Sequence, residues 1–164
     1  MTDLTEYKEV TVRQAFEALK ENGFEHLRGR WSAEDIEGVI TGGCALQQIA
    51  LNLGVEGNSR DSQDEEDQYT LANQLNRWVI RKDSRWAKDE YGDVSEYRGL
   101  GDIIMEWNDR YEGTIYNNKT GRYERQYTLP TYQDVVNMAE QVLRPHMDKT
   151  IKLRTRTWNA RKVA

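Results

Sequence analysis

The chain has 164 residues, 31% of them charged and 37% hydrophobic, with five Trp and nine Tyr. This length suits one domain with a real core, and the aromatic residues supply apolar area that a disordered chain lacks. No apolar run approaches the roughly 20 residues that cross a bilayer, so the sequence predicts a protein without membrane spans.

The net charge of −5 is distributed unevenly along the chain. Residues 149–164 hold six basic and no acidic residues, whereas the rest holds 17 basic (23 minus 6) against 28 acidic residues. Such asymmetry indicates either a nucleic-acid contact or a basic segment that docks on the protein's own acidic body. The two explanations carry equal weight.

The first residues and the cysteine content bear on the compartment. The segment 1–6 lacks the basic start and the apolar stretch of a secretion signal. The single cysteine, Cys44, has no partner for an internal disulfide. Both observations favour a reducing cytoplasm.

Helical spacing of apolar residues recurs along the chain. Thr11 and Gln14 form a capping box before the first helix, and Gly23 ends that helix. Thr131 and Asp134 form the same box before the last. We expect about five short amphipathic helices around one core, with apolar stripes at 12–19, 46–53, 71–79, 100–107 and 135–143. The segment 44–53 is the most apolar and is predicted as the central helix.

Between the first two helices the pattern is mixed. Phe24–Trp31 suits an extended stretch or a loop. Ser32 caps a predicted turn of helix, in which Trp31 and Ile36 would form a hydrophobic staple. The segment 41–43, Thr-Gly-Gly, is expected to break the structure before it.

The remaining segments predict loops and strands. We expect the acidic segment 56–68 to be a mobile loop and 82–99 to be irregular. Alternating aromatics around Asn117–Gly121 predict a β-hairpin near 112–129. The segment 150–157 alternates as a half-exposed strand, a candidate partner of that hairpin.

These elements predict a single α+β domain, mainly α, over residues 1–164. Its helical core covers 11–143 and contains a hairpin insertion at 110–129. A basic C-terminal segment at 146–164 follows, and no repeat or linker divides the chain.

The sequence lacks the patterns of a catalytic cysteine, of a Cys/His metal site and of a calcium-binding loop. Cys44 follows two glycines at a helix start, but His26 and His146 do not stand in a cysteine-hydrolase context, so a small buried hydrophobe is favoured over a nucleophile. One Cys and two distant His make no metal-ligand spacing, and the acidic segment lacks the pattern of a calcium loop. We therefore expect no enzyme, no metal and no cofactor.

Two short motifs are candidates for ligand binding. Arg28-Gly29-Arg30-Trp31 combines guanidinium groups and an indole that can hold a phosphate and stack a base. The favoured alternative is a loop that packs the indole into the core. Trp107-Asn108-Asp109 ends a helix, where a structural role explains all three residues. The candidate ligand residues are Arg28, Arg30, Trp31, Trp107, Asn108 and Asp109, and the candidate nucleic-acid residues are Lys152, Arg154 and Arg156.

Four short segments together resemble an uncharacterised family of small actinobacterial and phage proteins, a domain of unknown function. They are Asn22-Gly23-Phe24, Cys44-Ala45-Leu46, the run 103–109 that ends in Trp-Asn-Asp, and Asp134-Val135-Val136. The resemblance covers residues 11–143, and this chain departs from it by the hairpin insertion and the basic tail. It implies a fold and a phage-like context in the cytoplasm of a bacterial host, and no catalytic residues.

The leading hypothesis is therefore a non-enzymatic phage accessory protein that antagonises a host defence system. It would sequester a small nucleotide signal or cover a host protein. One alternative is a nucleic-acid-binding protein that uses the basic C-terminal segment. Another is a small enzyme that uses Cys44.

Overall fold

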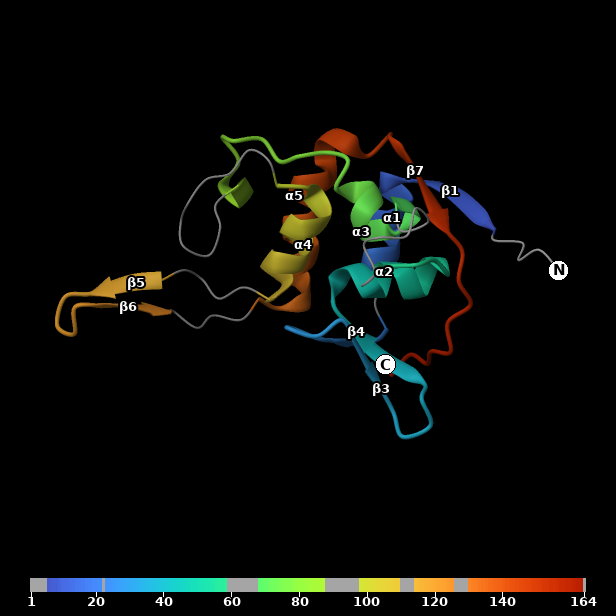
Figure 1. The fold of residues 1–164 in the computed structure, drawn as a ribbon, viewed down its shortest axis with the longest axis horizontal. Helices are drawn as coiled ribbons and strands as arrows, with labels where there is room; N and C mark the ends of the chain where they lie inside the picture. The colour runs from blue at the N-terminus through green and yellow to red at the C-terminus, as the bar shows by residue number, and fades with distance from the viewer. Residues whose placement is uncertain are drawn as a thin grey trace.

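The computed structural model describes residues 6–21, 23–58, 68–87, 98–109, 114–125 and 130–163. Within these ranges the chain forms five α-helices and seven strands (Figure 1). In chain order the elements are β1 (Tyr7–Thr11), α1 (Val12–Glu21), β2 (Glu25–His26), β3 (Ser32–Glu34), β4 (Ile40–Gly43), α2 (Ala45–Leu53), α3 (Leu71–Leu75), η2 (Arg85–Ala87), α4 (Leu100–Asp109), β5 (Thr114–Asn117), β6 (Arg122–Arg125), α5 (Tyr132–Leu143), η3 (Arg144–His146) and β7 (Thr150–Arg154).

The helices form the core, and the predicted α+β, mainly helical fold is confirmed. Helix α2 lies at the centre and contacts α1, α3 and α4, while α5 packs against α1 and α4. Leu46 and Ile49 of α2 are fully buried, as are Leu19 of α1 and Ile104 of α4. Burial of such side chains supplies most of the driving force for folding, at roughly 25 cal/mol per Å² of apolar surface.

The predicted helix ends are confirmed by hydrogen bonds. Thr11 N donates to Gln14 Oε1 over 2.8 Å, and Gln14 N donates back to Thr11 Oγ1 over 3.1 Å. Thr131 and Asp134 form the same reciprocal pair before α5. These caps satisfy amides that would otherwise lack partners in the first helical turn.

The third predicted helix is shorter than the periodicity of 71–79 indicates. Helix α3 ends at Leu75, and Trp78 lies outside it, half-buried. The carbonyl of Trp78 accepts a hydrogen bond from Leu100 N, and Ile80 N donates to Arg98 O. The backbone beyond Leu75 thus pairs with the segment before α4, which prevents the helix from continuing.

The C-terminal strand is confirmed, but its partner is the N-terminal segment and not the hairpin. Strands β1 and β7 pair antiparallel, with Val10 opposite Ile151 and Glu9 opposite Lys152. Val10 and Ile151 are buried, whereas Glu9 and Lys152 are exposed. The two-stranded sheet therefore has one face on the core and one in solvent.

The segment around Ser32 forms a strand, so the predicted helical turn is wrong. Strands β2, β4 and β3 make a small sheet with β4 in the middle. Asp35 Oδ1 accepts hydrogen bonds from Glu37 N and Val39 N, which folds 35–39 into a turn and leaves Ile36 fully exposed. The predicted break at 41–43 is also wrong, because β4 includes these residues. A Cβ on Gly42 would lie 3.0 Å from Glu25, so glycine permits this close pairing.

The predicted hairpin is confirmed as β5 and β6, which pair with Tyr116 opposite Tyr123. Most of the acidic segment 56–68, part of the segment 82–99, and the ends of the insertion 110–129 lie outside the described residues. None of the described helices has the length and apolar character needed to cross a bilayer.

Candidate functional site

The Trp-Asn-Asp motif lies at the centre of a hydrogen-bond network. Asn108 is fully buried, and its Nδ2 donates to Leu27 O over 2.9 Å and to Asp109 Oδ1 over 2.8 Å. Its Oδ1 accepts from Ala45 N over 3.1 Å and from His26 Nε2 over 2.7 Å. Because a backbone N–H only donates and a carbonyl only accepts, these partners fix the orientation of the amide. All four hydrogen-bonding positions of Asn108 are occupied.

The loop after β2 is bound to the same network. Asp109 Oδ1 also accepts from Gly29 N over 2.6 Å. Arg28 donates through Nε to Pro130 O over 3.0 Å and through Nη2 to the same oxygen. The structure therefore brings Arg28, Asn108 and Asp109 together, but it uses their polar groups to connect β2, α2, α4 and the start of α5.

The other candidate ligand residues lie apart from this network. Arg30 is exposed, whereas Trp31 is half-buried and packs against the core. The indole of Trp107 meets that of Trp86 edge-on, at 4.6 Å between ring centroids, and donates to Trp86 O over 3.3 Å. Of the six predicted residues, only Arg28, Asn108 and Asp109 thus take part in the network, and ligand binding by the six stays a prediction.

Cys44 is the N-cap residue of α2 and follows Gly43, which pairs with His26 in the sheet. The thiol is buried, and this burial raises its pKa to about 11. His26 Nε2 carries a hydrogen that it donates to Asn108, and burial holds the pKa of His26 below its usual value. A neutral thiol without a base bonded to it is a poor nucleophile.

The described side chains that could bind a metal ion are also dispersed. Across the part of the chain that the structure describes, no three His, Cys, Asp or Glu side chains gather in a way that would hold a metal ion.

The basic C-terminal segment docks on the body over much of its length. Arg156 pairs with Glu56 at 3.1 Å, and Arg161 pairs with Asp35 at 3.0 Å. Backbone bonds join the same regions: Glu56 N donates to Arg154 O, and Ile40 N donates to Asn159 O. This geometry favours the docking explanation of the charge asymmetry, although exposed ion pairs contribute less than the backbone bonds.

The same segment also places its cations on aromatic rings. The Lys152 ammonium lies 4.9 and 5.2 Å from the ring centroids of Tyr7 and Tyr69, which meet edge-on at 4.9 Å. Lys149 lies 5.0 Å from the ring of Trp78, and the Arg156 guanidinium lies 3.9 Å from that of Trp158. Cation–ring contacts therefore recur along this segment, from Lys149 to Trp158.

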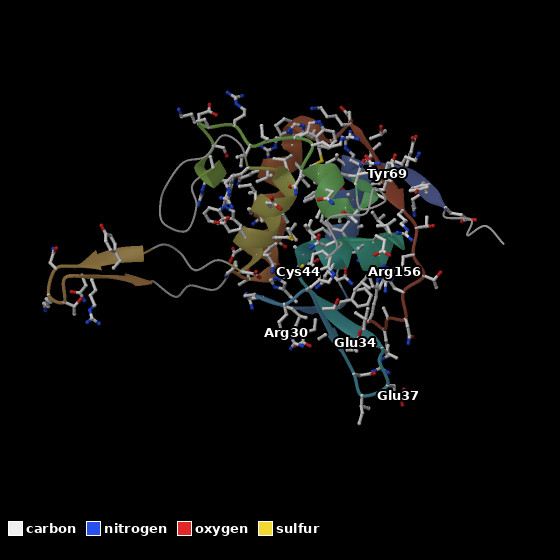
Figure 2. All side chains as sticks on the ribbon, viewed as in Figure 1. Arg30, Glu34, Glu37, Cys44, Tyr69 and Arg156 are labelled. Atoms are coloured by element: carbon white, nitrogen blue, oxygen red, sulfur yellow. The ribbon has the colours of Figure 1, made fainter. Side chains whose placement is uncertain are left out.

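A groove of about 1000 Å³ continues this surface beyond β7. It lies between residues 154–162 and the ends of α1 and α2. Its lining includes the cations Arg154, Arg156 and Lys162, the indole of Trp158, and the carboxylates of Glu6 and Glu21. Figure 2 shows Tyr69 and Arg156 on the side followed by β7 and the segment after it, whereas Arg30 lies by the β2–β3 loop. We call Tyr7, Tyr69, residues 149–158 and this groove the C-terminal face.

Sequence reasoning found the cations of this face but missed its rings. Tyr7 stands in the segment Tyr7–Thr11, whose Tyr, Val and Thr residues favour strands and were a usable signal. Tyr69 had no such signal, because only the fold brings it next to Tyr7 across 62 positions of sequence (69 minus 7).

Comparison with known proteins found no match: no family model, no curated protein and no solved structure is similar to this chain. The resemblance to the actinobacterial and phage family therefore stays a prediction, and the site rests on geometry alone.

Proposed function

We propose that this chain is a non-enzymatic protein that binds single-stranded nucleic acid on its C-terminal face. The observation that carries the proposal is the set of cation–ring contacts that recur from Lys149 to Trp158, with Lys152 over two tyrosines. Proteins that hold single strands combine cations for the phosphates with aromatic rings for the bases.

The dimensions of the C-terminal face suit an extended ligand. Strand β7 and the segment up to Lys162 run along the body, and an extended chain advances about 3.3 Å per residue. The groove adds Thr157 beside Arg156, whereas the hydroxyl of Thr155 donates to Glu6 O over 2.9 Å. Hydroxyl and guanidinium groups are frequent partners of phosphate oxygens.

The acidic residues on this face set the expected affinity. Glu9 lies opposite Lys152, and Glu6 and Glu21 line the groove. Carboxylates repel phosphates, and the pairing of Arg156 with Glu56 must loosen before the guanidinium meets a ligand. Binding is therefore expected to be modest and to weaken steeply as salt is added.

A small phosphate-bearing nucleotide is the second candidate ligand. The groove volume lies at the upper end of the range of small-molecule sites, and three cations line it. With such a ligand, the protein would sequester a small nucleotide signal, as the leading hypothesis from the sequence proposes. Thermal-shift measurements with cyclic and ADP-ribose-type nucleotides test it, and a ligand of this class would raise the Tm.

Fluorescence anisotropy with a labelled single strand of about 20 nucleotides tests the main proposal, because this length exceeds the site of one small domain. The wild type should bind at low salt, and Lys152→Ala/Arg156→Ala should bind at least tenfold more weakly. The slope of the logarithm of its binding constant against the logarithm of the salt concentration should be shallower by about 1.4. Each phosphate contact to a single strand contributes about 0.7 to this slope, and the variant removes two cations.

Lys82→Ala/Arg85→Ala is the matched control. It removes the same charge from two exposed residues outside the C-terminal face, so it should bind as the wild type does. Absence of wild-type binding to DNA and RNA at low salt, or equal loss in both double variants, contradicts the proposal.

A further inference from the structure

The β5–β6 hairpin forms a two-stranded sheet of its own. Thr114 lies opposite Arg125, and Asn117 opposite Arg122, at the two ends of a regular antiparallel ladder. Asn117 Oδ1 accepts from Lys119 N over 2.8 Å, and Gly121 N donates to Asn117 O over 2.8 Å. Figure 1 shows the hairpin extending away from the helices as an arm.

The side chains of this arm that the structure describes, at residues 117–123, are mostly polar and include two cations. Residues 118–123 are all exposed, and Tyr123 retains 75% of its accessible surface. The arm, residues 114–125, contains three basic residues and one acid, Glu124, in a chain whose net charge is −5. A two-stranded hairpin is marginally stable by itself in water, so an arm of this kind gains most from a partner that it contacts.

We propose that the arm contacts duplex nucleic acid as a two-stranded ribbon in a groove. The major groove, about 12 Å wide, admits a two-stranded β-ribbon. Lys119 and Arg122 would meet phosphates, and the Tyr123 ring offers a face to sugars or bases. The inference rests on the proposed nucleic-acid binding and extends it from single strands on the C-terminal face to duplexes on the arm.

The charge of the arm favours duplex nucleic acid over an apolar protein surface as its partner. Among residues 117–123, the side chains that the structure describes include two cations and no large aliphatic group. The competing occupant is the acidic body of a second copy of the chain. That arrangement would appear as a dimer in solution that dissociates when the arm's cations are removed.

The test compares a labelled duplex with a labelled single strand of the same length. Lys119→Ala/Arg122→Ala should bind the duplex at least tenfold more weakly, with a salt slope shallower by about 1.8, because each duplex phosphate contact contributes about 0.9. Its single-strand affinity should equal that of the wild type. Lys152→Ala/Arg156→Ala should show the reverse pattern.

The matched control is again Lys82→Ala/Arg85→Ala, which should bind both ligands normally. Unchanged duplex binding by the arm variant overturns the inference, as does a wild-type dimer, seen by light scattering, that the arm variant converts to a monomer. If the wild type binds the duplex but not the single strand, the proposed function is overturned and the arm's role stands. The two failures are therefore distinguishable.

Discussion

Asn108 is the residue on which the arrangement of several elements depends. Its amide joins Leu27 beyond β2 to Ala45 at the start of α2, and it is fully buried. Asn108→Ala would leave a buried donor and a buried acceptor unpaired, at about 1–3 kcal/mol each. We expect the free energy of unfolding to fall by about 2–5 kcal/mol, measured by urea denaturation.

The control for this prediction is Asn118→Ala, which changes an exposed asparagine in the hairpin turn. It should leave the free energy of unfolding within about 0.5 kcal/mol of the wild type. A similar small change for Asn108→Ala would show that the network contributes little.

The sequence singled out Asn108 but could not assign its role. Its partners Leu27 and Ala45 lie 81 and 63 positions away, so no local pattern connects them. The same limit applies to Cys44 and His26. The sequence showed neither that the sheet pairs His26 with Gly43, the residue before Cys44, nor that burial raises the pKa of the thiol to about 11.

The two histidines predict a pH dependence of stability. Burial lowers the pKa of His26, and burial together with Lys149 lowers that of His146. The unfolded chain therefore takes up protons near pH 6.5 while the folded chain resists them. The free energy of unfolding should be greatest above about pH 6.5 and should fall as the pH drops below it.

Urea titrations at about pH 7.5 and about pH 5.5 measure this effect, because the two values bracket an ordinary histidine pKa. His26→Gln retains an amide donor toward Asn108 and cannot titrate, so it should show a smaller difference between the two pH values. An unchanged difference would assign the pH dependence to other groups.

At the scale of elements, the docked C-terminal segment is expected to stabilise the β2–β4–β3 sheet. Ile40 N donates to Asn159 O over 2.8 Å, and Arg161 N donates to Ile40 O over 2.8 Å. Deletion of 159–164 removes both bonds and should lower the free energy of unfolding by about 2 kcal/mol. The Ile40 amide should also exchange its hydrogen faster.

Arg161→Ala is the matched control for the deletion, because it breaks only the exposed ion pair with Asp35. It should cost less than about 1 kcal/mol and leave the exchange of the Ile40 amide unchanged. If the deletion leaves that exchange unchanged as well, the segment does not stabilise the sheet.

Helices were easier to predict from this sequence than strands. The apolar spacing and caps located α1, α2, α4 and α5 because both signals are local. Strands β2, β3 and β4 have two to four residues each, too few for a period to appear. Their pairing depends on Gly42 and on the turn at Asp35, which are compatible with several structures.

At the scale of the whole molecule, the negative net charge opposes polyanion binding while the C-terminal face favours it. Glu9 is exposed on that face opposite Lys152, so Glu9→Lys should strengthen single-strand binding several-fold at low salt. The gain should fade as salt rises, since the screening length is about 10 Å at 0.1 M.

Glu37→Lys changes the net charge by the same amount, and Figure 2 shows Glu37 at the tip of the β3–β4 turn, away from Tyr69. It should have a much smaller effect on affinity. Equal gains from the two substitutions would indicate that only the total charge matters and would argue against a defined face.

The most direct measurement of the central claim is ultraviolet cross-linking of the intact protein to a single-stranded oligonucleotide, followed by mass spectrometry of the peptides. Bases that stack on aromatic rings cross-link to them. If single strands bind on the C-terminal face, we expect cross-links at its rings, Tyr7, Tyr69 or Trp158. Cross-links confined to Trp31, or none at low salt, would contradict it.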